Sequence, residues 1–139
     1  MLYIMKDYVL LGRSNTMERK KVWAVYFSAT DTTKKTVLTI ADEAARLLGA
    51  EREDYDFTLP GMRESGFAAG KDDLVIFGTP VYAGRVPNVL LKYLATIQGN
   101  GALAVPVVLF GNRNFDDGLI ELRDILENTG FHTVAAAAF

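Results

Sequence analysis

Three continuous apolar runs, each followed by a segment of helical periodicity, constrain the fold of this chain most. The runs are VWAVYFS (22–28), LVIFGTP (74–80) and ALAVPVVLFG (102–111). Short runs of this kind are typical of strands buried on both faces of a sheet. Because strands and helices alternate along the chain, the sequence predicts an α/β fold in which a parallel sheet carries helices on both faces.

The helical segments are marked by apolar stripes and by residues that start or stop helices. Gly49 ends the first helix, Pro87 is expected in the first turn of the second, and Asp116 or Asp117 is expected to cap the third. The stripes are Val37, Ile40, Ala41, Ala44, Leu47 and Leu48 in the first helix, Leu90, Tyr93, Leu94 and Ile97 in the second, and Leu119, Leu122, Ile125 and Leu126 in the third.

Two weaker segments bring the predicted strand count to five. EREDYDFTL (51–59) is heavily charged, which suits an edge strand, where charge blocks unwanted pairing. FHTVAAAAF (131–139) is a poor strand by propensity because it is rich in alanine. Pro106 is expected near the beginning of its strand or at a position that needs no backbone donor.

The first sixteen residues differ from the rest and are predicted to be an N-terminal extension, with a single domain over 17–139. MLYIMKDYVLL contains Lys6 and Asp7 and lacks a small-residue cleavage site. It has about half of the ~20 residues that a spanning helix needs. We therefore expect neither a signal peptide nor a membrane anchor.

Composition excludes several kinds of site. Acidic residues number 17 and basic residues 15, and neither forms a long block, so no footprint for nucleic acid or a membrane surface is expected. The chain has no cysteine, which excludes disulfides, iron–sulfur clusters and thiolate zinc sites. This suits the cytoplasm, and any redox chemistry would need an organic cofactor.

Sheets of this type place ligands at the carboxyl ends of their strands. The loops expected there are 28–33, 79–87 and 111–117. The first is rich in hydroxyls, and a helix start adds free backbone N–H groups, so together they suit a phosphate monoester. A hydroxyl-rich turn is also a common helix cap, and this alternative stays open.

The first loop resembles the phosphate-binding loop of flavodoxins, whose usual form is hydroxyl–x–Thr–Gly–x–Thr. Ser28, Thr30 and Thr33 fill the hydroxyl places. Asp31 stands where glycine normally adopts a left-handed turn, a conformation that aspartate tolerates. Its carboxylate is expected to repel phosphate unless it points outward or caps the helix, and the lysines at 34 and 35 offset part of that repulsion.

The other two loops resemble those of a flavodoxin-like subfamily. TPVYAGRVP is similar to its flavin-contacting PVY-G-R-P loop, and GNRNFDDGL to its GNR loop, with Phe115 where tyrosine is common. The resemblance implies that Tyr82 offers a flat ring, that the backbone near Gly84 contacts flavin N5, and that residues 111–114 bind the pyrimidine edge. Arg85 and Arg113 are candidate cations beside the reduced flavin.

From about Lys21 onward the chain is similar to the flavodoxin half of bacterial flavodoxin–ferredoxin fusion proteins, whose other half holds two four-iron clusters. The resemblance implies a flavodoxin-like three-layer sandwich with strand order 2-1-3-4-5 and FMN as cofactor. It implies an electron carrier or a small FMN-dependent oxidoreductase with a redox partner such as a ferredoxin. The cysteine-rich half and the fifth helix do not follow, so the domain is expected to be truncated after its fifth strand.

The missing helix would leave one sheet face uncovered. Ile4, Met5, Tyr8 and Leu11 share a helical face, and residues 2–11 are predicted to cover that site in the same chain or in an exchanged homodimer.

The predicted site contains no catalytic acid or base and no metal ligand; His132 is expected to be structural or exposed. Two alternatives stay open: a degenerate remnant that keeps the fold without FMN, favoured by Asp31, and a phosphoacceptor receiver domain, disfavoured because the first strand ends in Phe27 and Ser28. The residues predicted to bind FMN are Ser28, Ala29, Thr30, Asp31, Thr32, Thr33, Thr79, Pro80, Val81, Tyr82, Ala83, Gly84, Gly111, Asn112, Arg113, Asn114, Phe115 and Asp117.

Overall fold

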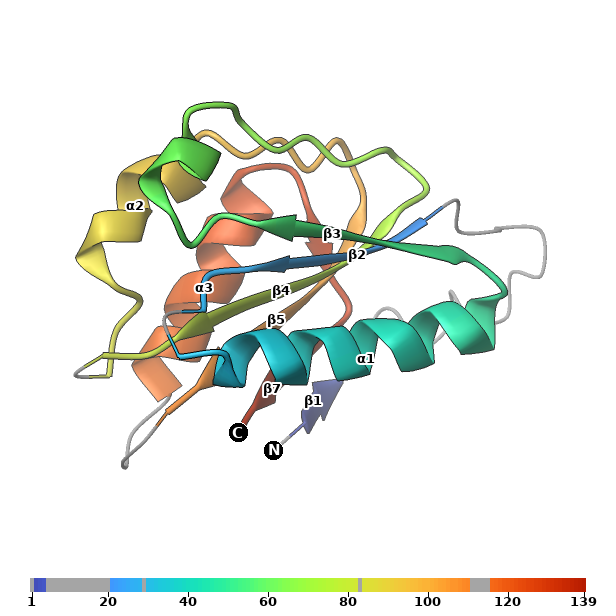
Figure 1. The fold of residues 1–139 in the computed structure, drawn as a ribbon, viewed down its shortest axis with the longest axis horizontal. Helices are drawn as coiled ribbons and strands as arrows, with labels where there is room; N and C mark the ends of the chain where they lie inside the picture. Colours follow the sequence, from blue (N-terminus) through green and yellow to red (C-terminus); the bar gives the residue numbers. More distant parts are fainter. Residues whose placement is uncertain (1, 5–20, 29, 83, 111–115) are drawn as a thin grey trace.

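The computed structural model describes residues 2–4, 21–28, 30–82, 84–110 and 116–139 (Figure 1). Its strands are β1 (Leu2–Ile4), β2 (Lys21–Tyr26), β3 (Glu51–Asp56), β4 (Leu74–Pro80), β5 (Leu103–Leu109), β6 (His132–Thr133) and β7 (Ala135–Ala138). Its helices are α1 (Thr32–Leu48), α2 (Asn88–Leu94), α3 (Asp116–Asn128) and the short 3₁₀ helix η2 (Pro60–Arg63).

The strands form one sheet in the order β1-β7-β5-β4-β2-β3. Every pair from β3 to β7 is parallel, and β6 pairs with β5 beside β7. The parallel part therefore has the predicted order 2-1-3-4-5. The charged strand β3 lies at one edge, as predicted.

Helices cover both faces of the sheet, as predicted (Figure 1). On one face Val37 and Ala41 of α1 pack with Val22 and Ile76 of the strands. On the other face the buried sides of α2 and α3 pack with aromatic residues such as Phe77. The result is a three-layer arrangement with a separate core on each side of the sheet.

Helix α1 approaches β4 very closely because residue 78 is a glycine. A Cβ atom at Gly78 would lie 2.2 Å from Cγ2 of Val37 and 3.2 Å from Cγ2 of Thr33. Any side chain at residue 78 would therefore force the helix away from the strand. The glycine fixes the first turns of α1 directly over the end of β4, next to the loops at the carboxyl edge.

Pro106 lies in the middle of β5, opposite Phe77 of β4. Its missing N–H coincides with a break in the final strand. Residues 103 and 104 pair with β6, residues 107 and 108 pair with β7, and the register advances by one residue between the two pairs. The predicted strand 131–139 is thus split by a bulge that lies opposite Pro106. Pro106 has no N–H to donate to that strand, so it lies at a position that needs no backbone donor, as expected.

The N-terminal prediction is wrong for residues 2–4, which form a strand and not part of a helix. β1 runs antiparallel to β7, with Leu2 opposite Ala137 and Ile4 opposite Ala135. It lies at the sheet edge and extends the ladder of its own chain, whereas the remainder of the predicted helix lies outside the described residues. A strand is favoured here because β7 otherwise presents an unpaired backbone edge.

Two helix starts differ slightly from expectation. Pro87 is the capping residue just before α2 and not a residue of its first turn. α3 begins at Asp116, so Asp117 lies inside its first turn. A further difference is that β3 and β4 are joined by η2 and irregular chain, without an α-helix.

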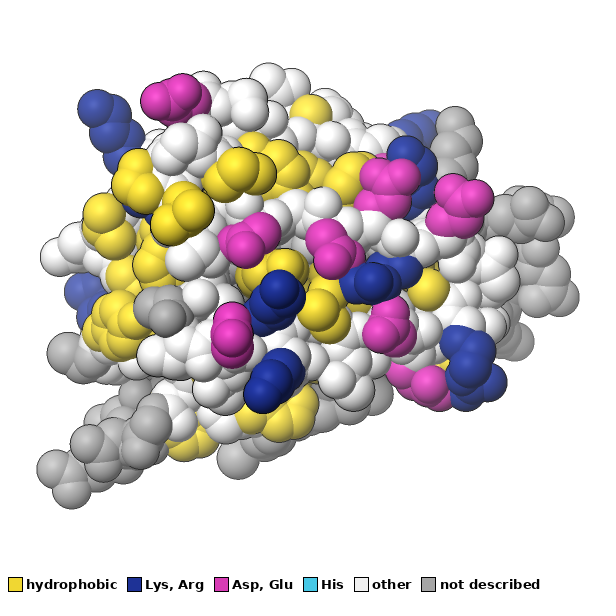
Figure 2. All heavy atoms as spheres, viewed as in Figure 1, with side chains coloured by type: hydrophobic (Ala, Val, Ile, Leu, Met, Phe, Trp, Pro, Cys, Tyr) yellow, Lys and Arg dark blue, Asp and Glu magenta, His cyan; other side chains and the backbone are white. Residues whose placement is uncertain are grey.

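Figure 2 shows that the viewed face of the molecule is divided by chemistry. Charged side chains of both signs alternate over α1 and β3, whereas hydrophobic ones gather toward α2 and η2. Leu59, Met62 and Val89 are the large apolar side chains exposed in those segments. Among the described residues, no helix is long and apolar enough to span a membrane.

Candidate functional site

The loops at the carboxyl edge of the sheet, on the left of Figure 1, surround a pocket of about 580 Å³. The first loop and the start of α1 supply one wall. The end of β4 with its following loop and the end of β5 with the last residue supply the rest. The lining residues are Thr30, Thr32, Thr33, Thr36, Pro80, Val81, Tyr82, Leu109, Phe110 and Phe139.

Backbone hydrogen bonds hold the last three of these segments together. The N–H of Val81 donates to the carbonyl of Leu109 at 2.8 Å, and the N–H of Phe110 donates to the carbonyl of Phe139 at 3.0 Å. Strand pairing thus continues past β4 and β5 into the pocket wall. The predicted convergence of the first two loops is present in the structure.

Ser28 anchors the start of α1. Its Oγ accepts the backbone N–H of Lys34 at 3.0 Å, and its own N–H donates to Oγ1 of Thr58 at 2.9 Å. The serine hydroxyl therefore satisfies one of the free amides of the first helical turn. Its proton has no acceptor among the described residues, and a hydroxyl oxygen can accept one bond and donate another.

Thr33 is the polar side chain best placed to meet a ligand. It is only 4% exposed, yet it lines the pocket. Among the described residues, the hydroxyls of Thr30, Thr32 and Thr33 have no hydrogen-bond partner, whereas Thr36 donates to the carbonyl of Thr32 at 3.1 Å. The hydroxyl of Thr33 is not one of the fully buried unpaired atoms, so a ligand in the pocket could accept a hydrogen bond from it.

Asp31 adopts the left-handed conformation that glycine usually supplies, with φ 66° and ψ −13°. Its carbonyl accepts the N–H of Lys35 at 3.0 Å, but its side chain makes no capping hydrogen bond. The side chain is exposed and is not part of the pocket lining. The Asp31 carboxylate therefore points outward and does not cap the helix. This is one of the two arrangements that were expected to reduce its repulsion of a phosphate.

Tyr82 sits at the rim on a tight turn. It exchanges two backbone hydrogen bonds with Arg85, at 2.9 and 3.0 Å, and Gly84 takes φ 78°, a value that favours glycine. The tyrosine is 52% exposed and lines the pocket, so one ring face is available to a flat ligand.

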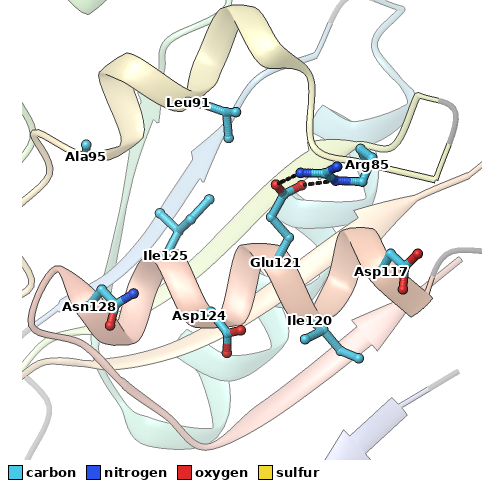
Figure 3. Close-up of a pocket in the computed structure, with 9 residues that line it drawn as sticks. All are labelled: Arg85, Leu91, Ala95, Asp117, Ile120, Glu121, Asp124, Ile125 and Asn128. Atoms are coloured by element: carbon cyan, nitrogen blue, oxygen red, sulfur yellow. Dashed lines mark hydrogen bonds and ion pairs between the residues drawn. The ribbon is translucent and has the colours of Figure 1, made fainter.

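Arg85 forms an ion pair with Glu121 and does not line the pocket that contains Thr33. This corrects the expectation that Arg85 is a cation beside a flavin. Its guanidinium bonds to the Glu121 carboxylate at 2.6 Å, and Glu121 also accepts the N–H of Val86 at 2.8 Å (Figure 3). The hydrogen bond from Arg85 lowers the pKa of Glu121, and the same bond raises the pKa of Arg85. This clamp ties the Tyr82 turn to α3.

The clamp stands at one end of a second pocket, of about 560 Å³, between α2 and α3 (Figure 3). Asp117 lies in this second pocket and not in the one lined by Thr33. Thr79 lines neither pocket, because it is completely buried, and its Oγ1 has no partner among the described residues. The predicted residues at 29, 83 and 111–115 lie outside the described part of the chain.

Four lining residues were not predicted. Thr36 follows Thr32 and Thr33 by one helical turn, and this spacing alone could have included it. Leu109 and Phe110 end the third apolar run, where the expected loop was placed one residue later. Phe139 carried no signal, because its position depends on pairing between β5 and the final strand.

Comparisons with known proteins bear on the fold. No family model matches the chain, and no curated protein matches it. Among solved structures, it is similar to a flavodoxin of Streptococcus pneumoniae TIGR4, with 20% identity and a TM-score of 0.60 over 85% of this chain and 82% of that one. It is also similar to a Fusobacterium nucleatum flavodoxin bound to flavin mononucleotide, with 22% identity and a TM-score of 0.54 over 83% and 69% of the two chains.

A third likeness is to a flavodoxin, WrbA-like protein of Agrobacterium tumefaciens, with 18% identity and a TM-score of 0.54 over 81% of this chain and 75% of that one. Identities this low inform on architecture only. Together with the strand order and the helices on both faces, they show that this chain has the flavodoxin-like α/β fold.

Proposed function

We propose that this chain binds FMN in the pocket lined by Thr33 and Tyr82 and acts as an electron-transfer flavoprotein. One observation carries the proposal: unpartnered hydroxyls at a helix start and an exposed aromatic ring line the same pocket. Its volume of about 580 Å³ is within the range usual for small-molecule sites.

The donors fit a phosphorylated flavin. The hydroxyls of Ser28, Thr30, Thr32 and Thr33 would hold the phosphate, together with the free amides and the positive dipole end of α1. The ring of Tyr82 and the apolar side chains of Val81 and Leu109 would exclude water around the flat part. FMN, when bound, supplies the redox chemistry, and the protein binds and orients it.

The third loop completes the proposal. Residues 111–114 would present amide groups to the pyrimidine edge, and the backbone at Ala83 and Gly84 would face flavin N5. The electron partner would be a separate protein such as a ferredoxin, in the cytoplasm. Carrier and small FMN-dependent oxidoreductase are both compatible with this site, since neither needs a side-chain acid or base.

Titration of the purified protein with FMN, followed by quenching of flavin fluorescence, tests the proposal. We expect saturable binding, and we expect Thr33→Val to weaken it by about 1.5–3 kcal/mol, because the variant removes a hydrogen bond to a charged ligand while keeping the side-chain shape. Thr39→Val is the matched control, because Thr39 is an exposed threonine of the same helix, with its hydroxyl bonded to the carbonyl of Lys35 at 2.8 Å.

The alternative is a protein that keeps the fold for a binding or structural role without flavin. Asp31 favours it, because an acidic residue holds the left-handed position that glycine holds in the usual flavodoxin phosphate loop. Absence of quenching at millimolar FMN would support this alternative and reject the proposal. Equal loss of affinity in the Thr33→Val and Thr39→Val variants would reject the assignment of the phosphate to this helix start.

A further inference from the structure

We infer that Thr58 is a positioning residue for the phosphate of the flavin, and that it acts through Ser28. The inference rests on the proposed function and adds to it a residue outside the pocket lining. Thr58 lies two residues after the end of β3, in a segment where the sequence predicted no site residue. Its role is to hold the first loop, so that the donors at the start of α1 are in place before a ligand binds.

The bonds made by Thr58 itself give the first step. Its N–H donates to Oδ1 of Asp56 at 2.9 Å, and its hydroxyl donates to the same oxygen. Its carbonyl accepts a bond of 2.9 Å from the guanidinium of Arg63. The backbone and the side chain of Thr58 are therefore fixed together, from both sides of the residue.

The direction of the hydroxyl bond gives the second step. An ionised carboxylate can only accept, so the proton of the Thr58 hydroxyl is committed to Asp56. The lone pairs of its Oγ1 are left to accept, and the backbone N–H of Ser28 donates to this oxygen at 2.9 Å. A charged acceptor also polarises the hydroxyl, which strengthens the bond that its oxygen accepts. Thr58 therefore holds the peptide group with which the first loop begins.

Ser28 passes this constraint on to helix α1. Asp31 is the capping residue of the helix, but its side chain makes no capping bond. Oγ of Ser28 caps the helix instead, because it accepts the N–H of Lys34 at 3.0 Å. The amides of Thr32 and Thr33 have no partner among the described residues, so they are left for a ligand. One serine thus connects the segment after β3 to the helix turn that presents these amides.

Burial makes the bond between Ser28 and Thr58 hard to replace. Ser28 is 9% exposed and Thr58 is half-buried, so water has little access to the bond between them. A valine at residue 58 would set a methyl group against the N–H of Ser28. A donor that loses its partner without gaining water costs free energy, and the first loop can avoid that cost only by moving.

The consequence is expected for the phosphate and not for the ring of the flavin. The proposed function places Val81, Tyr82 and Leu109 around the ring. These residues are held by other bonds, such as those from Val81 to Leu109 and between Tyr82 and Arg85, and none of these bonds involves Thr58. Riboflavin has the same ring as FMN and no phosphate. The ratio of the two affinities therefore reports on the start of α1.

The test measures the affinities for FMN and riboflavin, by quenching of flavin fluorescence, in the natural protein and in Thr58→Val and Thr58→Ser. Valine removes the hydroxyl and keeps the side-chain shape, whereas serine keeps the hydroxyl. Thr129→Val is the matched control. Thr129 is also half-buried, and its hydroxyl bonds to the carbonyl of Ile125 at 3.0 Å, at the end of α3.

We expect Thr58→Val to weaken FMN binding about tenfold and riboflavin binding less than about twofold. Thr58→Ser and Thr129→Val should stay within about twofold of the natural protein for both flavins, because neither breaks the bond to Ser28. In a Ser28→Ala background, Thr58→Val should weaken FMN binding less than about threefold, because the side chain through which it acts is absent.

The outcomes separate this inference from the proposed function. Equal weakening of both flavins in Thr58→Val would mean that Asp56 and Thr58 only close the turn after β3, and it overturns the inference alone. An undiminished effect in the Ser28→Ala background, or no effect of Thr58→Val at all, overturns it as well. If the natural protein is folded by circular dichroism and binds neither flavin, the proposed function is overturned, and this inference with it.

Discussion

Glu121 shows how one carboxylate fixes a loop that belongs to another part of the chain. It accepts bonds from both the guanidinium of Arg85 and the N–H of Val86, next to the turn that carries Tyr82. Gly118, one turn earlier on α3, lets the helix approach, because a Cβ atom there would lie 2.8 Å from Cγ2 of Val81. The turn that carries Tyr82 is therefore held against α3.

The Glu121 clamp predicts a pH dependence of stability. Because the folded protein lowers the pKa of Glu121, the clamp stabilises fully above the unfolded value of about 4.3 and is lost as pH falls through the lower folded value. The free energy of unfolding of the natural protein should therefore fall more steeply between about pH 5 and about pH 3 than that of Glu121→Gln.

Urea unfolding at a series of pH values measures this difference. Glutamine can still accept the N–H of Val86, so the variant removes the charge and keeps one hydrogen bond. Glu64→Gln is a suitable control, because Glu64 is exposed and outside the clamp. Parallel curves for the natural protein and the Glu121→Gln variant would contradict a stabilising role for the charge.

Residue-level predictions succeeded where the cause is local. The left-handed conformation of Asp31 was predicted from its match to the glycine of the flavodoxin phosphate loop, and the cap at Gly49, with φ 64°, from the end of the apolar stripe. The prediction for Arg85 was wrong because its partner, Glu121, is 36 positions away in the sequence. No local pattern identifies a contact between two surface charges at that separation.

At the scale of elements, the contact between α1 and β4 decides where the helix start lies. Gly78→Ala would place a methyl group 2.2 Å from Cγ2 of Val37, a buried side chain that cannot move freely. We expect this variant to lose about 1–3 kcal/mol of unfolding free energy by overpacking, and to bind FMN more weakly because α1 shifts. Thermal unfolding and FMN titration measure the two effects.

A double-mutant cycle tests whether the cause is this contact. Val37→Ala removes the opposing methyl groups and leaves space for the alanine at residue 78. The double variant should therefore be more stable than the sum of the single effects predicts. Additive losses would mean that Gly78 acts through something other than its distance from α1.

Periodicity predicted most elements and failed where pairing partners decide. The stripes located α1, α2 and α3, and the apolar runs located β2, β4 and β5. The split of the final strand into β6 and β7 follows from Pro106 in the neighbouring strand, which its own sequence does not reveal. The helical periodicity was misleading for residues 2–4, because the edge of β7 pairs with them as a strand.

For the whole molecule, β1 closes the edge of the sheet that β7 would otherwise expose. Deleting residues 1–16 should therefore lower the melting temperature by several degrees, as expected for a loss of about 1 kcal/mol in a small domain. It should also promote self-association, because an unpaired strand edge attracts another chain. Calorimetry and size-exclusion chromatography measure the two effects.

A shortened chain that melts at the same temperature and stays in the same oligomeric state would contradict this role for β1. Substituting Ile4 alone is a weaker test, because backbone bonds, and not one side chain, make the pairing with Ala135. The deletion therefore examines the edge directly.

The convergence of distant loops is the property of the whole molecule that the sequence predicts best. Parallel strands bring their carboxyl ends to one edge, so loops 28–33 and 79–87 had to meet there. The strand order itself came from resemblance to flavodoxins. The lining contributed by Leu109, Phe110 and Phe139 could not be predicted, since it depends on the registers of β4, β5 and the final strand.

The most direct test of the central claim is to map FMN onto the folded chain by amide chemical-shift perturbation. We predict that the largest changes fall on residues 28–36, 80–85 and 109–114, in and beside the pocket lined by Thr33 and Tyr82. Changes centred on the α2–α3 pocket at Leu91 and Ile125, or no saturable changes at all, would contradict it.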